Sequence, residues 1–110
     1  MHLLVAILHR EEVLDEILSV LVEQELPDSV VIESRTGLEL LERDLPIFAG
    51  LRSLIPGGID FSRLVLCVVS DPARAQRALA AIRDLGSGVA AAAEQPNTVF
   101  LVPLSDIAHF

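Results

Sequence analysis

The sequence contains two short apolar runs, His2–Leu8 and Leu64–Val69, and these constrain the fold most strongly. Both have the length of a β-strand and are rich in branched residues, and neither alternates with polar residues. A strand that is apolar on both faces must be covered on both faces. We therefore expect both runs to be central strands of a sheet with other protein on each side.

Two helices are predicted from apolar residues at helical spacing. The first lies between residues 10 and 25 and ends at Leu26-Pro27-Asp28. For the second, Ser70-Asp71 offers an N-cap, Pro72 suits the first helical position and Gly86 suits the position after the last turn. The expected buried stripes are Val13/Leu14, Ile17/Leu18 and Leu21/Val22 in the first helix, and Ala75, Ala78/Leu79, Ile82 and Leu85 in the second.

Ser29–Arg35 and Thr98–Pro103 read as two further strands, and they complete a βαββαβ order within a single domain of residues 1–110. The predicted fold class is α+β, a ferredoxin-like sandwich. It has an antiparallel four-stranded sheet, two helices on one face and a long insertion between the second and third strands. The other face would be an apolar patch too large for an ordinary monomer, and we expect Val65 and Cys67 to lie on it. Self-association would cover this face.

Composition excludes several classes of function. Sixteen acidic residues against eight basic ones give a net charge of −8, which disfavours binding to nucleic acid. All basic residues are Arg, so lysine-dependent chemistry is absent, and the chain has no Tyr or Trp. The single cysteine, Cys67, excludes an intrachain disulfide and fits a reduced, cytoplasmic location. The first apolar run is too short for membrane insertion.

The pattern resembles the PII-like (GlnB-like) family of signal-transduction proteins across nearly the whole chain. Five features carry the resemblance. The first three are an opening strand at Leu3–Leu8, a second strand that ends in Arg35-Thr36-Gly37, where the family turns into its T-loop, and a third strand with a polar turn at Arg63–Asp71. The fourth is Gly86-Ser87-Gly88, which stands at the place of the family's B-loop. The fifth is a last strand at Thr98–Leu104, followed by the tail Ser105-Asp106-Ile107.

The resemblance implies a cytoplasmic homotrimer with effector sites in clefts between subunits and a T-loop that signals to a protein partner. The effector in the family is typically an adenine nucleotide. The family's B-loop lysine, C-terminal arginines and T-loop tyrosine have no counterpart here, where the tail reads Ile107-Ala108-His109-Phe110. If ATP or ADP binds, we therefore expect weak binding.

The candidate effector-binding residues are Arg35, Gly37, Arg63, Gly86, Ser87 and Gly88. Backbone N–H groups of Gly86-Ser87-Gly88 can bind an anion, and Arg83, or Arg35 and Arg63, can supply the cation across a subunit boundary. The alternative for the glycine segment is a helix C-cap followed by a flexible loop.

Residues 37–60 are too long and too apolar for a simple linker. Leu41, Leu45 and Phe48 predict helix within residues 38–45 and again within 46–55, with these side chains buried. Three interpretations are open. The segment packs on the oligomer and covers apolar surface, it docks a protein partner, or it contacts a membrane, which Glu39, Glu42 and Asp44 disfavour because they would face anionic lipid.

No motif for catalysis or for metal binding is present, so we expect a non-enzyme without a metal site. His2, His9 and His109 lack metal-ligand spacing and read as solvated residues near the termini. The leading hypothesis is a PII-like trimeric regulatory protein with a small effector. The alternative is a CutA-like trimer that serves metal tolerance or a structural role and does not bind nucleotide.

Overall fold

A computed structural model describes residues 1–35, 37, 40, 62–85 and 96–110. The described elements follow the order β1 (His2–Leu8), α1 (Glu11–Glu23), β2 (Val30–Glu33), β3 (Arg63–Val69), α3 (Pro72–Leu85) and β4 (Thr98–Pro103). The expected α+β architecture, with a four-stranded antiparallel sheet and two helices, is confirmed, and it is compatible with a ferredoxin-like fold.

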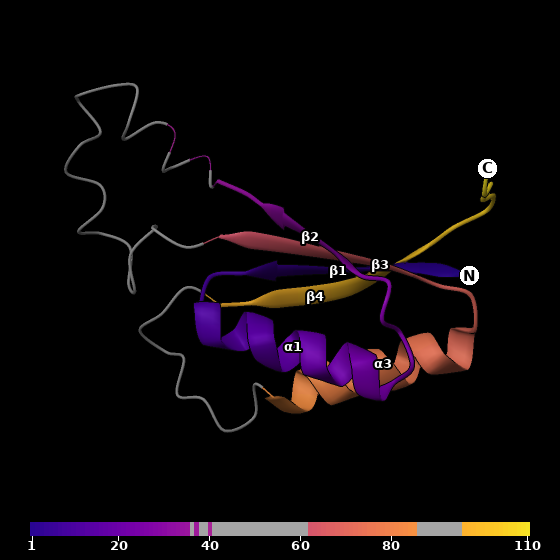
Figure 1. Ribbon diagram of the computed structural model, residues 1–110, viewed down its shortest axis with the longest axis horizontal. Coiled ribbons are helices and arrows are strands. Elements are labelled where there is room, and N and C mark those ends of the chain that lie inside the picture. The colour runs from indigo at the N-terminus through magenta and orange to yellow at the C-terminus, as the bar shows by residue number, and fades with distance from the viewer. Residues whose placement is uncertain (36, 38–39, 41–61, 86–95) are drawn as a thin grey trace.

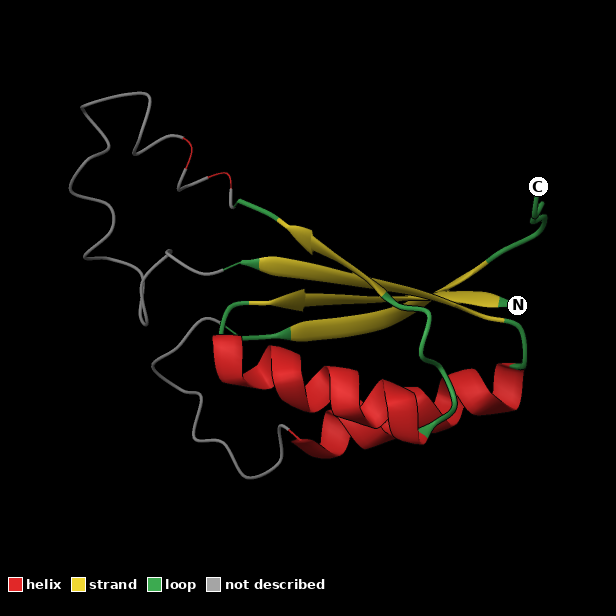
Figure 2. Ribbon diagram, viewed as in Figure 1, coloured by secondary structure: helices red, strands yellow, loops and turns green. Residues whose placement is uncertain are grey.

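The strands lie in the order β2-β3-β1-β4, and every neighbouring pair is antiparallel. The two apolar runs, β1 and β3, are therefore the central strands, as their composition predicts. Figures 1 and 2 show both helices packed side by side against the same face of this sheet. A hydrogen bond of 3.0 Å from the Leu104 N–H to the Met1 carbonyl continues the contact between β4 and β1 past the strand ends.

The hydrophobic core fills the space between the sheet and the two helices. From β1 and β3 it takes alternate residues, and from the helices it takes one stripe each. Its most deeply buried members are Leu4, Ala6, Leu8, Ile17, Leu21, Val65, Val69, Ala75 and Ala78. In α1 the stripe differs from the prediction at one position, because Val20 is buried whereas Val22 is 62% exposed.

The helix boundaries follow from local chemistry. In α3 the Asp71 carboxylate accepts the Ala73 N–H at 3.0 Å, and Pro72 occupies the first helical position, as predicted. After α1 the chain turns at Glu25, whose φ of 62° lies in the left-handed region. The Leu26 N–H returns to the Leu21 carbonyl at 2.7 Å and the Glu25 N–H to Val22 at 3.0 Å, which is the Schellman pattern.

Glu25 adopts this conformation although it is not a glycine. Its carboxylate lies 3.2 Å from the Arg74 guanidinium, so the turn also connects the end of α1 to α3. Both side chains are substantially exposed, which makes the ion pair a small contribution to stability.

Two predictions fall on residues that the structure does not describe. The helices expected within 38–45 and 46–55, with Leu41, Leu45 and Phe48 buried, fall on residues that, apart from residue 40, lie outside the described part of the chain. The same holds for Gly86 as the residue that follows the second helix.

Candidate functional site

The face of the sheet opposite the helices is apolar, and no described helix covers it. We call it the open face. The strand register places on it Leu3, Val5 and Ile7 of β1, Leu64, Leu66 and Val68 of β3, Val30 and Ile32 of β2, and Thr98, Phe100 and Val102 of β4. All of these residues are apolar except Thr98. Val30, Ile32, Val68 and Phe100 are each at least 40% exposed.

The expectation that Val65 and Cys67 belong to this face is wrong. Both lie on the helix-covered face, where their exposed fractions are 0% and 3%. Cys67 pairs with Leu4 and Val65 with Ala6 across the β1–β3 ladder, and all four side chains belong to the core. Burial, and to a smaller extent the negative charge of Asp28, raise the pKa of the Cys67 thiol, so this group is an inert core residue rather than a reactive one.

One end of the sheet holds Arg35, Gly37 and Arg63, the three predicted site residues that the structure describes. There β2 ends, β3 begins, β1 ends and β4 begins, and the C-terminus of α3 lies at the same end (Figure 1). Arg35 follows β2 by two residues and is exposed, and Arg63 is the first residue of β3. Gly37 is exposed and faces open space, since a Cβ there would have no atom within 4 Å.

Arg63 is held in place by its surroundings. Its Nη1 donates a 2.9 Å hydrogen bond to the Ser62 carbonyl and lies 4.0 Å from Oε1 of Glu33, its partner in the β2–β3 register. The side chain is 28% exposed, whereas Glu33 is 82% exposed. The guanidinium therefore still faces solvent in part, although the Glu33 carboxylate offsets some of its charge.

A pair of serines joins β2 and β3 where the 37–60 connection leaves the sheet. The Ser34 N–H donates to the Ser62 carbonyl at 3.1 Å, and the two hydroxyls are 2.8 Å apart in a hydrogen bond. Ser62 is only 5% exposed. This arrangement fixes the chain on either side of the connection, and the sequence alone gave no signal for it.

Gly86, Ser87 and Gly88 lie outside the described residues, so their place relative to Arg35 and Arg63 is not specified. Arg83, the other candidate cation, is exposed on the last turn of α3. The structure thus brings Arg35, Gly37 and Arg63 to one end of the sheet.

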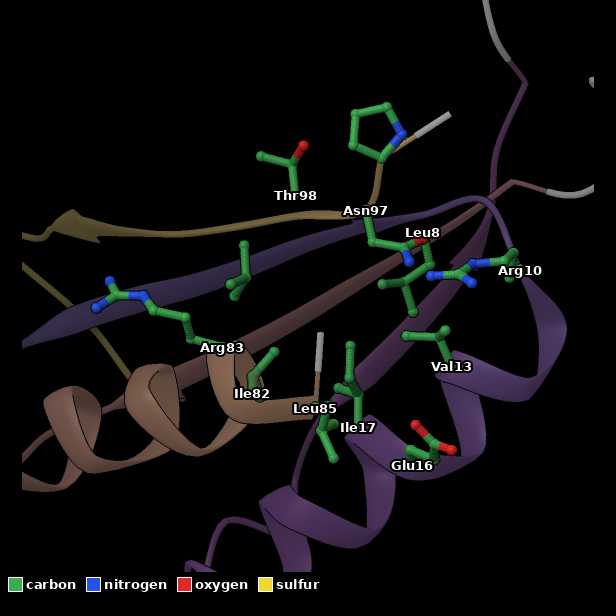
Figure 3. A pocket seen from close by; sticks show the side chains of 12 residues that line it. Leu8, Arg10, Val13, Glu16, Ile17, Ile82, Arg83, Leu85, Asn97 and Thr98 are labelled. Carbon is green, nitrogen blue, oxygen red and sulfur yellow. The ribbon is translucent and has the colours of Figure 1, made fainter. Parts of the chain in front are cut away.

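A pocket of about 410 Å³ lies at the same end, on the helix side of the sheet (Figure 3). It is bounded by α1, α3, the end of β1 and the start of β4, and its walls are largely apolar. Arg10 and Asn97 are among the polar residues that line it. Sequence reasoning missed both residues, because they are far apart in the chain and neither belongs to a motif.

The histidines near the chain ends differ from the expectation of solvated side chains. His109 is exposed, but His2 and His9 are half-buried, and the Nδ1 atom of each is buried. Over the described ranges, no group of three or more His, Cys, Asp or Glu side chains is arranged to hold a metal ion.

His9 makes the stability of the fold depend on pH. Burial lowers the pKa of its imidazole below the ordinary value of about 6.5. The unfolded chain therefore binds the proton more readily than the folded chain. The contribution of His9 is retained above about pH 6.5 and is lost as the pH falls from there through the lowered folded pKa.

We expect the free energy of unfolding, measured by urea denaturation, to fall between pH 7.5 and pH 5 less steeply in His9→Gln than in the wild type. His109→Gln is the matched control, since that side chain is exposed, and it should keep the wild-type slope. Equal slopes in all three proteins would contradict the role given to His9.

The comparisons of this chain with protein-family models and with curated proteins gave no match. Among the described helices, none is both long and apolar enough to cross a membrane.

Proposed function

We propose that this protein is a PII-like regulatory protein. It would form a homotrimer, bind a small effector in the clefts between subunits and signal to a protein partner through residues 37–60. The fold in this proposal is the ferredoxin-like βαββαβ sandwich, with residues 37–60 as its long insertion. The role is binding rather than catalysis.

The open face is the observation that carries this proposal. It extends over all four strands and is apolar apart from Thr98 at its margin. Monomers rarely expose a continuous apolar surface of this extent, because association removes it from water at a gain of about 25 cal/mol per Å². A second and third copy of the same sheet would supply an apolar surface of matching character.

The effector site is proposed at the sheet end that holds Arg35, Gly37 and Arg63. Two arginines beside the base of the 37–60 connection provide charge-assisted donors for an anionic effector. Binding there would directly affect the 37–60 connection, since Ser34 and Ser62 join its two ends. Glu33 beside Arg63, together with the absence of lysine, argues for weak rather than tight binding of ATP or ADP.

Thermal unfolding with added ligand tests this function. We expect millimolar ATP or ADP to raise the melting temperature of the wild type, because a ligand that binds only the folded state stabilises it. Arg63→Gln should reduce this shift, whereas Arg77→Gln should keep it, since Arg77 is an exposed arginine on α3 away from the proposed site.

The outcomes separate the two classes of protein. No nucleotide shift at any concentration, together with stabilisation by divalent copper, would contradict the nucleotide effector and favour the CutA-like alternative. An equal loss of the nucleotide-induced shift in melting temperature in Arg63→Gln and Arg77→Gln would contradict the proposed site. It would not contradict the proposed trimer.

A further inference from the structure

The pocket between the helices has the dimensions and the walls of a small-molecule site (Figure 3). Its volume is about 410 Å³, within the range of ligand pockets. Leu8, Ile17 and Ile82 form its deepest wall, with exposed fractions of 1%, 1% and 6%. Val13 and Val99 line its sides. An apolar group placed against these three residues would therefore lose part of its contact with water.

The polar groups of this pocket include two donors near the end of β1. The Asn97 Oδ1 accepts the His9 backbone N–H at 2.8 Å, which fixes the amide and leaves its NH₂ group as the part able to bond a ligand. Arg10, the next residue after His9, directs its guanidinium into the pocket beside Leu8 and Asn97 (Figure 3). Arg10 already has an interaction partner, but a guanidinium carries five N–H donors and can serve several acceptors.

The other charged residues of the wall lie apart from this donor pair. Arg83 contributes a second positive charge from α3, and Glu16 lies on α1, separated from Arg10 and Asn97 in Figure 3. The pocket therefore combines an apolar body with one end at which an anionic acceptor can be bound by an arginine and an amide.

We propose that this pocket binds a small monocarboxylate with an aliphatic body. The aliphatic part lies between α1 and α3, and the carboxylate accepts hydrogen bonds from the Arg10 guanidinium and the Asn97 amide. A neutral apolar molecule would bind less well, because it would take water from Arg10 without replacing its hydrogen bonds. The pocket is separate from the effector site proposed above, since Arg35, Gly37 and Arg63 do not line it.

Octanoate is the probe for this site, and 1-octanol is its uncharged counterpart. In a titration followed by backbone amide NMR, we expect saturable shifts for the amides of Val13, Ile17 and Asn97. Val68 and Val102 on the open face should not shift. Octanoate should bind at least about ten-fold more tightly than octanol, as expected for charge-assisted hydrogen bonds.

Variants separate the carboxylate contact from the apolar pocket. Arg10→Gln should weaken octanoate about ten-fold or more and leave octanol within about two-fold. Arg77→Gln, the matched control, should change neither. Val13→Trp, which fills the pocket from α1, should abolish the binding of both ligands while the remaining amide spectrum keeps its folded dispersion.

Three results would overturn the proposal. They are the absence of saturable shifts at the pocket amides, shifts confined to the open face, and equal octanoate affinities in Arg10→Gln and Arg77→Gln. None of these results would bear on the nucleotide site, because that site is tested by the separate loss in Arg63→Gln.

Discussion

Replacing Val68 with aspartate is expected to convert the proposed trimer, of about 36 kDa, into a folded monomer of 11.9 kDa. Val68 lies on the open face of the central strand β3, opposite Leu3 of β1, and is 43% exposed in the single chain. In the proposed trimer the sheets cover this position, so a carboxylate there would be buried without a partner. Light scattering gives the mass, and far-UV circular dichroism shows whether the fold is retained.

Val22→Asp is the matched control for this experiment. It introduces the same charge at an exposed valine, 62% accessible, on α1 and away from the open face. It should leave the trimer intact. A Val68→Asp protein that keeps the trimer mass would show that another surface makes the assembly, and a wild-type monomer at micromolar concentration would refute the assembly itself.

Val65→Asp, only three residues earlier on the same strand, is expected to unfold the chain. Val65 is fully buried beneath the helices and lies between Ala6 of β1 and Val31 of β2 in the sheet register. An ionised carboxylate in this core has no partner, and its burial costs several kcal/mol against a total stability of about 5–15 kcal/mol. Thermal unfolding followed by circular dichroism should show no cooperative transition above room temperature.

The two aspartate variants together test the facing of β3. A shift of one residue in a strand moves each side chain to the other face. If Val65→Asp stayed folded as a monomer and Val68→Asp unfolded, the register of β3 against β1 would be wrong by one position. A Val65→Asp protein with a nearly unchanged melting temperature would contradict the burial of this residue.

Which side chains of β3 face the helices could not be predicted from the sequence. Because Leu64–Val69 is apolar at every position, it has no alternation from which the two faces can be told apart. The sequence therefore indicated a central strand correctly but assigned Val65 and Cys67 to the wrong face. The register with β1 decides the matter, since it places Val65 beside Ala6 under the helices.

Local sequence signals predicted the helix boundaries better than they predicted which face of a helix or strand is buried. The cap at Asp71 and the proline after it predicted the start of α3, because both depend only on neighbouring backbone groups. The prediction for the buried stripe of α1 was wrong at one position, because Val22 is exposed whereas Val20 is buried. An apolar residue at the border of a helical stripe can lie on either side of it, and the crossing of α1 over the sheet decides which.

Only the part of the candidate site that follows from the strand topology could be predicted from the sequence. Alternating antiparallel strands bring the end of the second strand and the start of the third to one place, which explains why Arg35 and Arg63 were found at the same end of the sheet. The pocket was not predictable. Its donor pair depends on the Asn97 side chain bonding the His9 backbone across 88 residues of sequence, and no spacing rule encodes such a contact.

The strand order also sets when the sheet can be completed during synthesis. β1 is synthesised before the other three strands of this sheet, yet its two neighbours are β3 and β4, and β4 ends only at Pro103. Until then the first strand has an unpaired edge, and any early fragment exposes Leu3–Leu8 to other chains. Such long-range pairing slows folding. The nascent chain therefore remains prone to aggregation until β4 has paired with β1.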